Sequence, residues 1–257
     1  MSHKSRINEI NFNNFNNHMR IIGYRNYNDI DVYFEKYNWT ARHRTYGEFK
    51  RGGIKCPYEL RLCDVAYLGE GVYKTRDGNK KTKEYVEWSA MVQRCYNPYR
   101  INRDLTYKDC IVDDYFLCFQ NYAKWREQNY YEIPNEIMSL DKDILHKGNK
   151  IYSPNTCIFV PSRINSLLIK ADGIRGDLPI GVSYHKGYNK YSARCRIIDG
   201  NKKQSKFLGY YSNPQEAFYS YKTFKENYIK QVADEYKTLI PSQLYEALYR
   251  WEVDIDD

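Results

Sequence analysis

Short runs of β-branched and aromatic residues alternate with turn signals in the first part of the chain, residues 19–73. Residues 19–24 and 30–34 are such runs, and a glycine pair beginning at Gly52 interrupts the pattern. Runs of this kind are typical of strands joined by turns. We therefore expect a small antiparallel β domain over residues 19–73, preceded by a polar N-terminal arm over residues 1–18.

A helical period replaces this pattern in the middle segment, residues 84–169. Apolar side chains there recur three and four residues apart, which places them on one face of a helix. A second helix is expected to begin at Asp113 or Asp114, because carboxylates suit a helix N-terminus. Residues 137–168 then predict a strand, a glycine-containing loop, another strand and a helix. The apolar positions of the first helix are Tyr85, Trp88, Met91, Val92 and Cys95.

Three strands followed by a helix are expected in a C-terminal module, residues 178–237. An Asp-Gly pair at Asp199 is a hairpin signal between the last two strands. The helix is expected to begin with Asn213 as N-cap and Pro214 at its first position. Its apolar stripe can cover one face of the sheet and leave the other face free. The three predicted strands span residues 180–185, 190–197 and 205–211.

The pattern as a whole predicts an α+β protein. It comprises the small N-terminal β unit, the middle domain, and a C-terminal three-stranded antiparallel sheet packed on a helix. A last helix, expected within residues 238–257 after Pro241, carries Leu244 and Leu248 on one face. This helix either closes the core of its own chain or pairs two chains, so a homo-oligomer is one expectation.

Composition narrows the class of protein. The formal net charge of +8 permits a nucleic acid or an acidic protein as partner. The seven cysteines show no CxxC spacing, which is typical of reduced thiols in a cytosolic protein. No apolar run approaches the length of a membrane span, and no charged-then-apolar leader is present. We therefore expect a cytoplasmic protein without a membrane partner.

The excess positive charge is concentrated in the C-terminal module. Residues 180–211 contain seven lysines and arginines against one acid, Asp199. The strand period of two places Arg194 and Arg196 on one side, opposite Cys195 and its alternating neighbours. A twisted sheet with arginines on one face fits the major groove of DNA, where arginine bridges O6 and N7 of guanine. The alternative is a charged face that contacts only water.

The same segment resembles the AP2 DNA-binding domain. The resemblance rests on Gly181, Val182 and residues 190–193, 208–211 and 214–217, and it covers the whole module. It implies double-stranded DNA as partner. It implies the docking mode but not the target sequence, because several positions differ from those of plant members. Together with the basic residues Lys190 and Lys206, the expected DNA-binding residues are Ser183, His185, Lys190, Tyr191, Arg194, Arg196, Lys206 and Phe207.

Residues 85–168 resemble phage-encoded HNH endonucleases, which often carry an AP2 module. With residues 19–70, they give the layout of phage proteins labelled homing endonucleases. The resemblance implies an HNH-like ββα unit for the middle domain and the cytoplasm of a host cell as location. The matching residues are Trp88, Met91 and segments 94–97, 107–109, 111–112, 139–144, 147–150, 152–157 and 163–165.

HNH chemistry uses one divalent metal ion and a histidine that activates water. The resemblance implies Mg²⁺ or another divalent metal, held by Asp141, Asp143 and Asn165. His146 would act as the catalytic base beside Asp141. Two positions depart from the family, since a lysine follows Asp141 and Thr156 occupies an asparagine position. A solvated histidine and a salt-bridged strand end are the alternatives for these residues.

Two functions remain open from the sequence. In the first, the protein is a phage endonuclease that recognises DNA with the AP2-like sheet and cuts it with the metal centre. In the second, it is a catalytically inactive relative without a cofactor. It would then act as a DNA-binding regulator or as an inhibitor of a host anti-phage defence protein.

Overall fold

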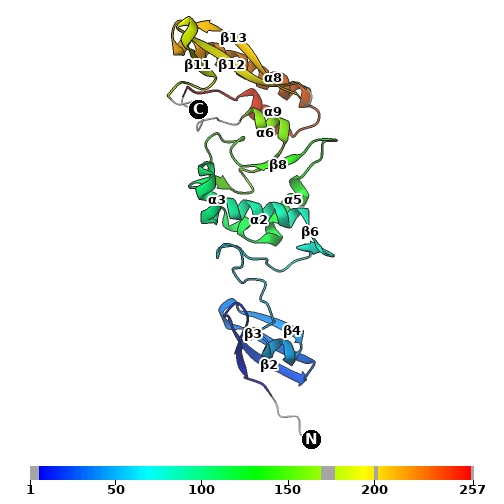
Figure 1. Cartoon of the computed structure of the whole chain (residues 1–257). Helices are drawn as coiled ribbons and strands as arrows, with labels where there is room; N and C mark the ends of the chain where they lie inside the picture. The colour runs from blue at the N-terminus through cyan, green and yellow to red at the C-terminus, as the bar shows by residue number, and fades with distance from the viewer. Residues whose placement is uncertain (1–5, 169–176, 200–201, 256–257) are drawn as a thin grey trace. The chain divides into compact units, whose positions relative to one another are not determined.

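The computed structural model describes residues 6–168, 177–199 and 202–255. The chain divides into two compact units, Met1–Gln128 and Asn129–Asp257, and each is described separately (Figure 1). The protein is of the α+β class, as the sequence predicts. The start of the predicted N-terminal arm and Gly200 of the predicted hairpin turn lie outside the described residues. The predicted middle domain, residues 84–169, includes the boundary between the units.

A four-stranded antiparallel sheet begins the first unit. Its strands pair in chain order, β1-β2-β3-β4, so each strand contacts its neighbour in sequence. Met19, Ile21, Phe34 and Phe49 are completely buried between one face of the sheet and helix α1. Part of the predicted arm thus belongs to the sheet as β1. The elements are β1 (Ile10–Phe12), β2 (His18–Asn26), β3 (Asp29–Phe34), β4 (Trp39–Arg44) and α1 (Tyr46–Lys50).

The rest of the first unit contains four α-helices and three two-residue strands among its described elements. The predicted helical face is confirmed, because Trp88, Met91 and Val92 of α2 are buried. The Trp88 indole N–H donates to the Phe116 carbonyl at 2.8 Å and joins two helices. Asp113 caps α4, as expected for a helix starting there. The elements are β5 (Arg76–Asp77), β6 (Lys80–Lys81), α2 (Lys83–Tyr96), α3 (Pro98–Arg103), β7 (Ile111–Val112), α4 (Asp114–Leu117) and α5 (Phe119–Asn129).

The second unit begins with the strand, loop, strand and helix that residues 137–168 predict. Strands β8 and β10 are antiparallel, and α6 follows β10 directly. Ile164 of α6 packs in one core with Ile229 of α8 and Leu244 of α9. The last helix therefore contributes its apolar face to the core of its own chain. The elements are β8 (Met138–Asp141), β9 (Ile151–Tyr152), β10 (Ile158–Pro161), α6 (Ser162–Leu167), α8 (Pro214–Tyr236) and α9 (Ser242–Tyr249).

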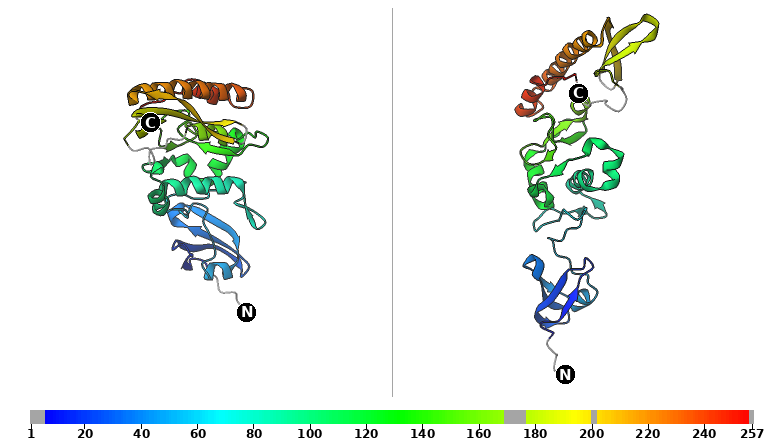
Figure 2. Two further views of the ribbon diagram at one scale, coloured as in Figure 1. Left: turned by 45° about the horizontal axis from the view of Figure 1, so that its top comes forward. Right: turned by 90° about the vertical axis from the view of Figure 1, so that its left-hand side faces the viewer.

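A three-stranded antiparallel sheet completes the second unit, with β11 (Val182–His185), β12 (Lys190–Asp199) and β13 (Lys202–Tyr211) in that order. Helix α8 covers one face of this sheet (Figures 1 and 2). The Asn213 side chain accepts the Glu216 N–H at 2.8 Å, so the predicted N-cap is confirmed. Ala193 and Cys195 of β12 are completely buried against the helix.

The two sheets share a hairpin connection that the sequence patterns above do not use. In both, a strand leads into a three-residue 3₁₀ helix, and a left-handed asparagine then turns the chain into the next strand. These asparagines are Asn38, with φ 47°, and Asn189, with φ 49°. The hydroxyl of Tyr33 donates to Asn38, and that of Tyr184 to Asn189. A tyrosine five residues before an asparagine is the sequence signal for this connection.

None of the helices formed by the described residues combines the length and apolar character needed to cross a membrane. The seven cysteines are free thiols, and six are buried, as their positions in apolar stretches predict.

The core position of α9 gives a first testable prediction. Leu244→Ala removes a completely buried side chain and is expected to lower the free energy of unfolding by about 2–5 kcal/mol. Chemical denaturation followed by circular dichroism measures this change. The neighbouring exposed residue provides the control, since Gln243→Ala is expected to change stability by no more than about 0.5 kcal/mol. Equal midpoints for the two variants would contradict the packing of α9.

Candidate nucleic-acid interface

The face of the β11–β13 sheet that points away from α8 carries the two arginines of β12. Arg194 lies opposite Phe207 of β13, and Arg196 lies opposite Ser205. Both arginines are exposed, whereas Cys195 between them is completely buried on the helix side. The sides of β12 are therefore those that the strand period predicts. We call the face with Arg194 and Arg196 the outward face.

The charge on the outward face is not neutralised. No aspartate or glutamate occurs in residues 182–198 or 203–211. Within the described part of the chain, neither Arg194 nor Arg196 forms a salt bridge. The Arg194 guanidinium lies over the Phe207 ring, 5.1 Å from its centroid. This cation–π contact orients the arginine but leaves its charge available to an anion.

Aromatic side chains lie beside the arginines. The His185 and Tyr188 rings stack with centroids 4.7 Å apart, and the Tyr188 and Tyr210 centroids are 5.0 Å apart. Phe207 also lies 5.0 Å from Tyr210 and connects this group to Arg194. Tyr188 is 63% exposed, so the group is accessible to a partner. Tyr188 and Tyr210 are not among the site residues expected from the sequence, because their position follows from the hairpin and the strand register.

Two predicted DNA-binding residues lie on the other side of the sheet. Tyr191 packs against the core between sheet and helix, and Lys206 lies opposite the buried Cys195. The strand period of two explains both corrections. Tyr191 is three positions from the outward-facing Arg194, and Lys206 is one position from the outward-facing Phe207, so both side chains point to the opposite side.

The other predicted residues belong to the outward face. Ser183 and His185 alternate with the buried Val182, and Lys190 lies opposite His185. Six predicted residues thus share the face, namely Ser183, His185, Lys190, Arg194, Arg196 and Phe207.

The N-terminal sheet, with the same hairpin, has two salt-bridged arginines, Arg20 and Arg25. On its outward face, Arg20 is 3.1 Å from Glu35. Arg25 bonds Asp31 at 2.8 Å and Asp29 at 2.6 Å. Hydrogen bonds from Arg25 lower the pKa of Asp31 to about 2. The two sheets therefore share a backbone element, but Arg20 and Arg25 are salt-bridged whereas Arg194 and Arg196 are not.

The predicted metal residues lie in and after the β8–β10 hairpin. The Asp141 Oδ1 atom accepts the backbone N–H groups of Asp143 at 2.9 Å and Ile144 at 2.8 Å. Burial, with the nearby Asp143 carboxylate, raises the pKa of Asp141 to about 6. The Lys142 ammonium is buried and lies 3.6 Å from Asp143. Asp141 thus acts as the acceptor that closes a backbone turn.

His146 and Asn165 are not joined to these aspartates. His146 is exposed in the loop after β8, and Asn165 lies in α6. No hydrogen bond or ion pair among the described residues connects either side chain to Asp141 or Asp143. In the same residues, no three histidine, cysteine, aspartate or glutamate side chains form a group that could hold a metal ion. The described residues thus show no assembled cluster of these side chains, and the divalent-metal centre that the resemblance implies stays a prediction.

No protein-family model matches the chain, and searches of curated proteins and of solved structures find no match.

The raised pKa of Asp141 gives a prediction about stability and pH. A carboxyl group with a higher pKa in the folded state binds its proton more tightly there, so stability falls as pH rises from about 4 to about 6. Asp141→Asn keeps the acceptor oxygen and removes the charge. It is expected to flatten this decline and raise stability at pH 7 by at most about 3 kcal/mol.

Unfolding free energies measured by denaturation between pH 4 and pH 7.5 test this effect. Asp177→Asn is the control, because that aspartate is exposed in the same unit. A pH dependence of Asp141→Asn identical to that of the unchanged protein would show that Asp141 does not titrate as described.

Proposed function

We propose that this chain binds double-stranded DNA with the outward face of the β11–β13 sheet. The observation that carries the proposal is the exposed, unneutralised pair Arg194 and Arg196 on a face without acidic residues. An exposed ion pair stabilises a fold by only about 0–1 kcal/mol, so the folding free energy gives no reason for these two arginines to be unpaired. A polyanionic partner would give such a reason, because it would bind both charges.

The shape of the sheet supports duplex DNA as the partner. A narrow β-ribbon fits a major groove about 12 Å wide, and arginine makes paired hydrogen bonds to guanine there. The contact with Phe207 limits the rotamers of Arg194 before binding, which reduces the entropy lost on contact. Lys190, at the hairpin end of β12, suits a phosphate, because lysine acts as a point charge.

The paired charges of the N-terminal sheet allow a matched experiment. Arg194→Ala with Arg196→Ala removes two unpaired charges. Arg20→Ala with Arg25→Ala removes the same charge from the N-terminal sheet, at two arginines that are salt-bridged. The first variant is expected to bind a short mixed-sequence duplex at least about tenfold more weakly. Its slope of log affinity against log salt is expected to fall by about 1–2.

Fluorescence anisotropy over a salt series measures both quantities, and circular dichroism checks that each variant is folded. The Arg20 and Arg25 variant is expected to keep the affinity and slope of the unchanged protein. Equal losses in the two variants would remove the outward face from the interface and leave a general effect of net charge.

We further propose that DNA binding occurs without strand cleavage. This proposal is supported by Asp141, whose carboxylate oxygen already accepts two backbone N–H groups, and by His146, which lies apart from it. The strand, strand and helix order of β8, β10 and α6 would then be a scaffold in the inactive relative that the sequence analysis left open.

Incubation of the purified protein with plasmid DNA and Mg²⁺ or Mn²⁺ is expected to leave the DNA intact. The Asp141→Ala variant is also expected to leave the DNA intact. Both the unchanged protein and this variant are expected to shift the DNA in a gel. Metal-dependent cutting that disappears in Asp141→Ala would instead establish the endonuclease.

A further inference from the structure

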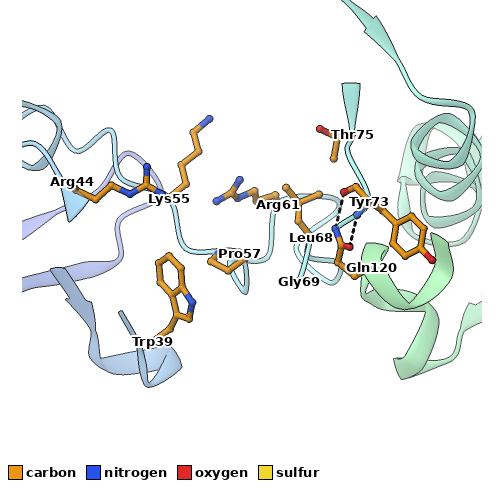
Figure 3. Close-up of a pocket in the computed structure, with 10 residues that line it drawn as sticks. All are labelled: Trp39, Arg44, Lys55, Pro57, Arg61, Leu68, Gly69, Tyr73, Thr75 and Gln120. Atoms are coloured by element: carbon orange, nitrogen blue, oxygen red, sulfur yellow. Dashed lines mark hydrogen bonds between the residues drawn. The ribbon is translucent and has the colours of Figure 1, made fainter. Parts of the chain in front are cut away.

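The first unit contains a pocket that is separate from the outward face. Its walls come from both ends of β4, the loop that follows α1, and the N-terminal turn of α5 (Figure 3). Its volume is about 370 Å³, within the range of pockets that enclose small ligands. Three of its residues are cations, namely Arg44, Lys55 and Arg61, and none of those that line it is acidic.

Two of the three cations have no salt-bridge partner within the described part of the protein, and the third, Arg61, is paired with Glu59. Arg44 and Lys55 are exposed and have no salt-bridge partner there. Arg61 bonds Glu59 at 2.6 Å and the Cys56 carbonyl at 2.7 Å, but its buried Nε atom has no hydrogen-bond partner. Figure 3 shows Arg44 and Arg61 approaching from opposite sides, with Lys55 between them. Converging cations with an unused donor favour an anion with several acceptor oxygens, such as a phosphate group.

The opposite wall is held in a fixed position. The Gln120 side chain accepts the Tyr73 N–H at 3.0 Å and donates to the Tyr73 carbonyl at 2.9 Å. Gly69 has φ 75°, and a Cβ atom there would lie 2.4 Å from the Cys118 sulfur. The segment from Gly69 to Tyr73 therefore fits closely against the start of α5. A wall that is already ordered reduces the entropy cost of binding a ligand.

An aromatic side chain stands beside the cations. The Trp39 indole N–H donates to the Glu70 carboxylate at 2.8 Å, and the Tyr58 hydroxyl donates to the same carboxylate at 2.9 Å. These bonds hold the Trp39 ring in place and engage both oxygens of the Glu70 carboxylate. Aromatic rings favour planar ligands such as nucleic-acid bases, which stack on them at a gain of about 1–3 kcal/mol. The pocket thus contains cations that suit a phosphate group and an aromatic ring that suits a base.

We propose that this pocket binds a nucleoside phosphate, with the phosphate between Arg44, Lys55 and Arg61 and the base beside Trp39. A free mononucleotide and an unpaired nucleotide of a DNA strand present the same chemistry. The site is independent of the DNA-binding outward face, because it uses other residues.

Isothermal titration of the full chain with three probes tests the site. The probes are adenosine monophosphate, inorganic phosphate and a short single-stranded oligonucleotide. The titrations use the Arg194→Ala, Arg196→Ala background, so that the outward face does not contribute. The pocket variant is Arg44→Ala with Lys55→Ala. The charge-matched control is Arg42→Ala with Lys80→Ala, two exposed cations of the same unit that do not line the pocket.

Binding of adenosine monophosphate or the oligonucleotide is expected, with affinity at least about tenfold lower in the pocket variant and unchanged in the control. Binding of the mononucleotide identifies a free nucleotide as the ligand, and binding of the oligonucleotide alone identifies a strand. Three results would overturn the proposal: no binding of either probe, equal losses in both variants, or inorganic phosphate binding as tightly as the nucleotide.

Discussion

The second unit depends on the burial of helix α8 by two different partners. One part of the helix, with Ala217 and Tyr221, covers the inner face of the β11–β13 sheet. Another part, with Ile229 and Val232, packs with α6 and α9. The Tyr228 hydroxyl joins these regions, because it bonds both the N–H and the carbonyl of Ile198 at 2.8 Å. Since α8 packs on the inner face, Val182, Ala193 and Cys195 are buried there, and the outward face carries the arginines and aromatic residues.

The two sheets have the same hairpin but differ in whether Arg25 and Arg194 are paired with acidic side chains. Both sheets use the hairpin in which a tyrosine hydroxyl bonds a left-handed asparagine, so the backbone does not explain their difference in charge. The N-terminal sheet surrounds Arg25 with Asp29 and Asp31, whereas the C-terminal sheet places Arg194 over an aromatic ring. Exposed ion pairs contribute little to stability, so neither arrangement is required for folding. The difference between the salt-bridged Arg25 and the unpaired Arg194 therefore concerns the surface, and the proposal of DNA binding by the β11–β13 sheet rests on it.

The turn after β8 illustrates how one residue type serves different purposes. A carboxylate at the end of a strand suits a metal ion, but it equally suits two backbone N–H groups of a tight turn. Asp141 makes the second kind of contact, and burial raises its pKa to about 6. A carboxyl group in that state is a poorer cation ligand than an exposed one, because binding must compete with both the proton and the N–H donors.

The sequence by itself determined the local elements of this protein. The three-and-four spacing from Trp88 to Val92 predicted the buried face of α2, and Asn213 with Pro214 predicted the start of α8. Periodicity and capping depend on neighbouring residues, so they can be recognised without tertiary contacts. Only the tertiary structure decided that α9 packs in the core of its own chain. It also placed Tyr188 and Tyr210, but not Tyr191 and Lys206, on the outward face. Finally, it brought Arg44, Lys55 and Arg61 together in one pocket. These facts join segments far apart in the chain, and their distances depend on how the elements pack, which local spacing does not specify.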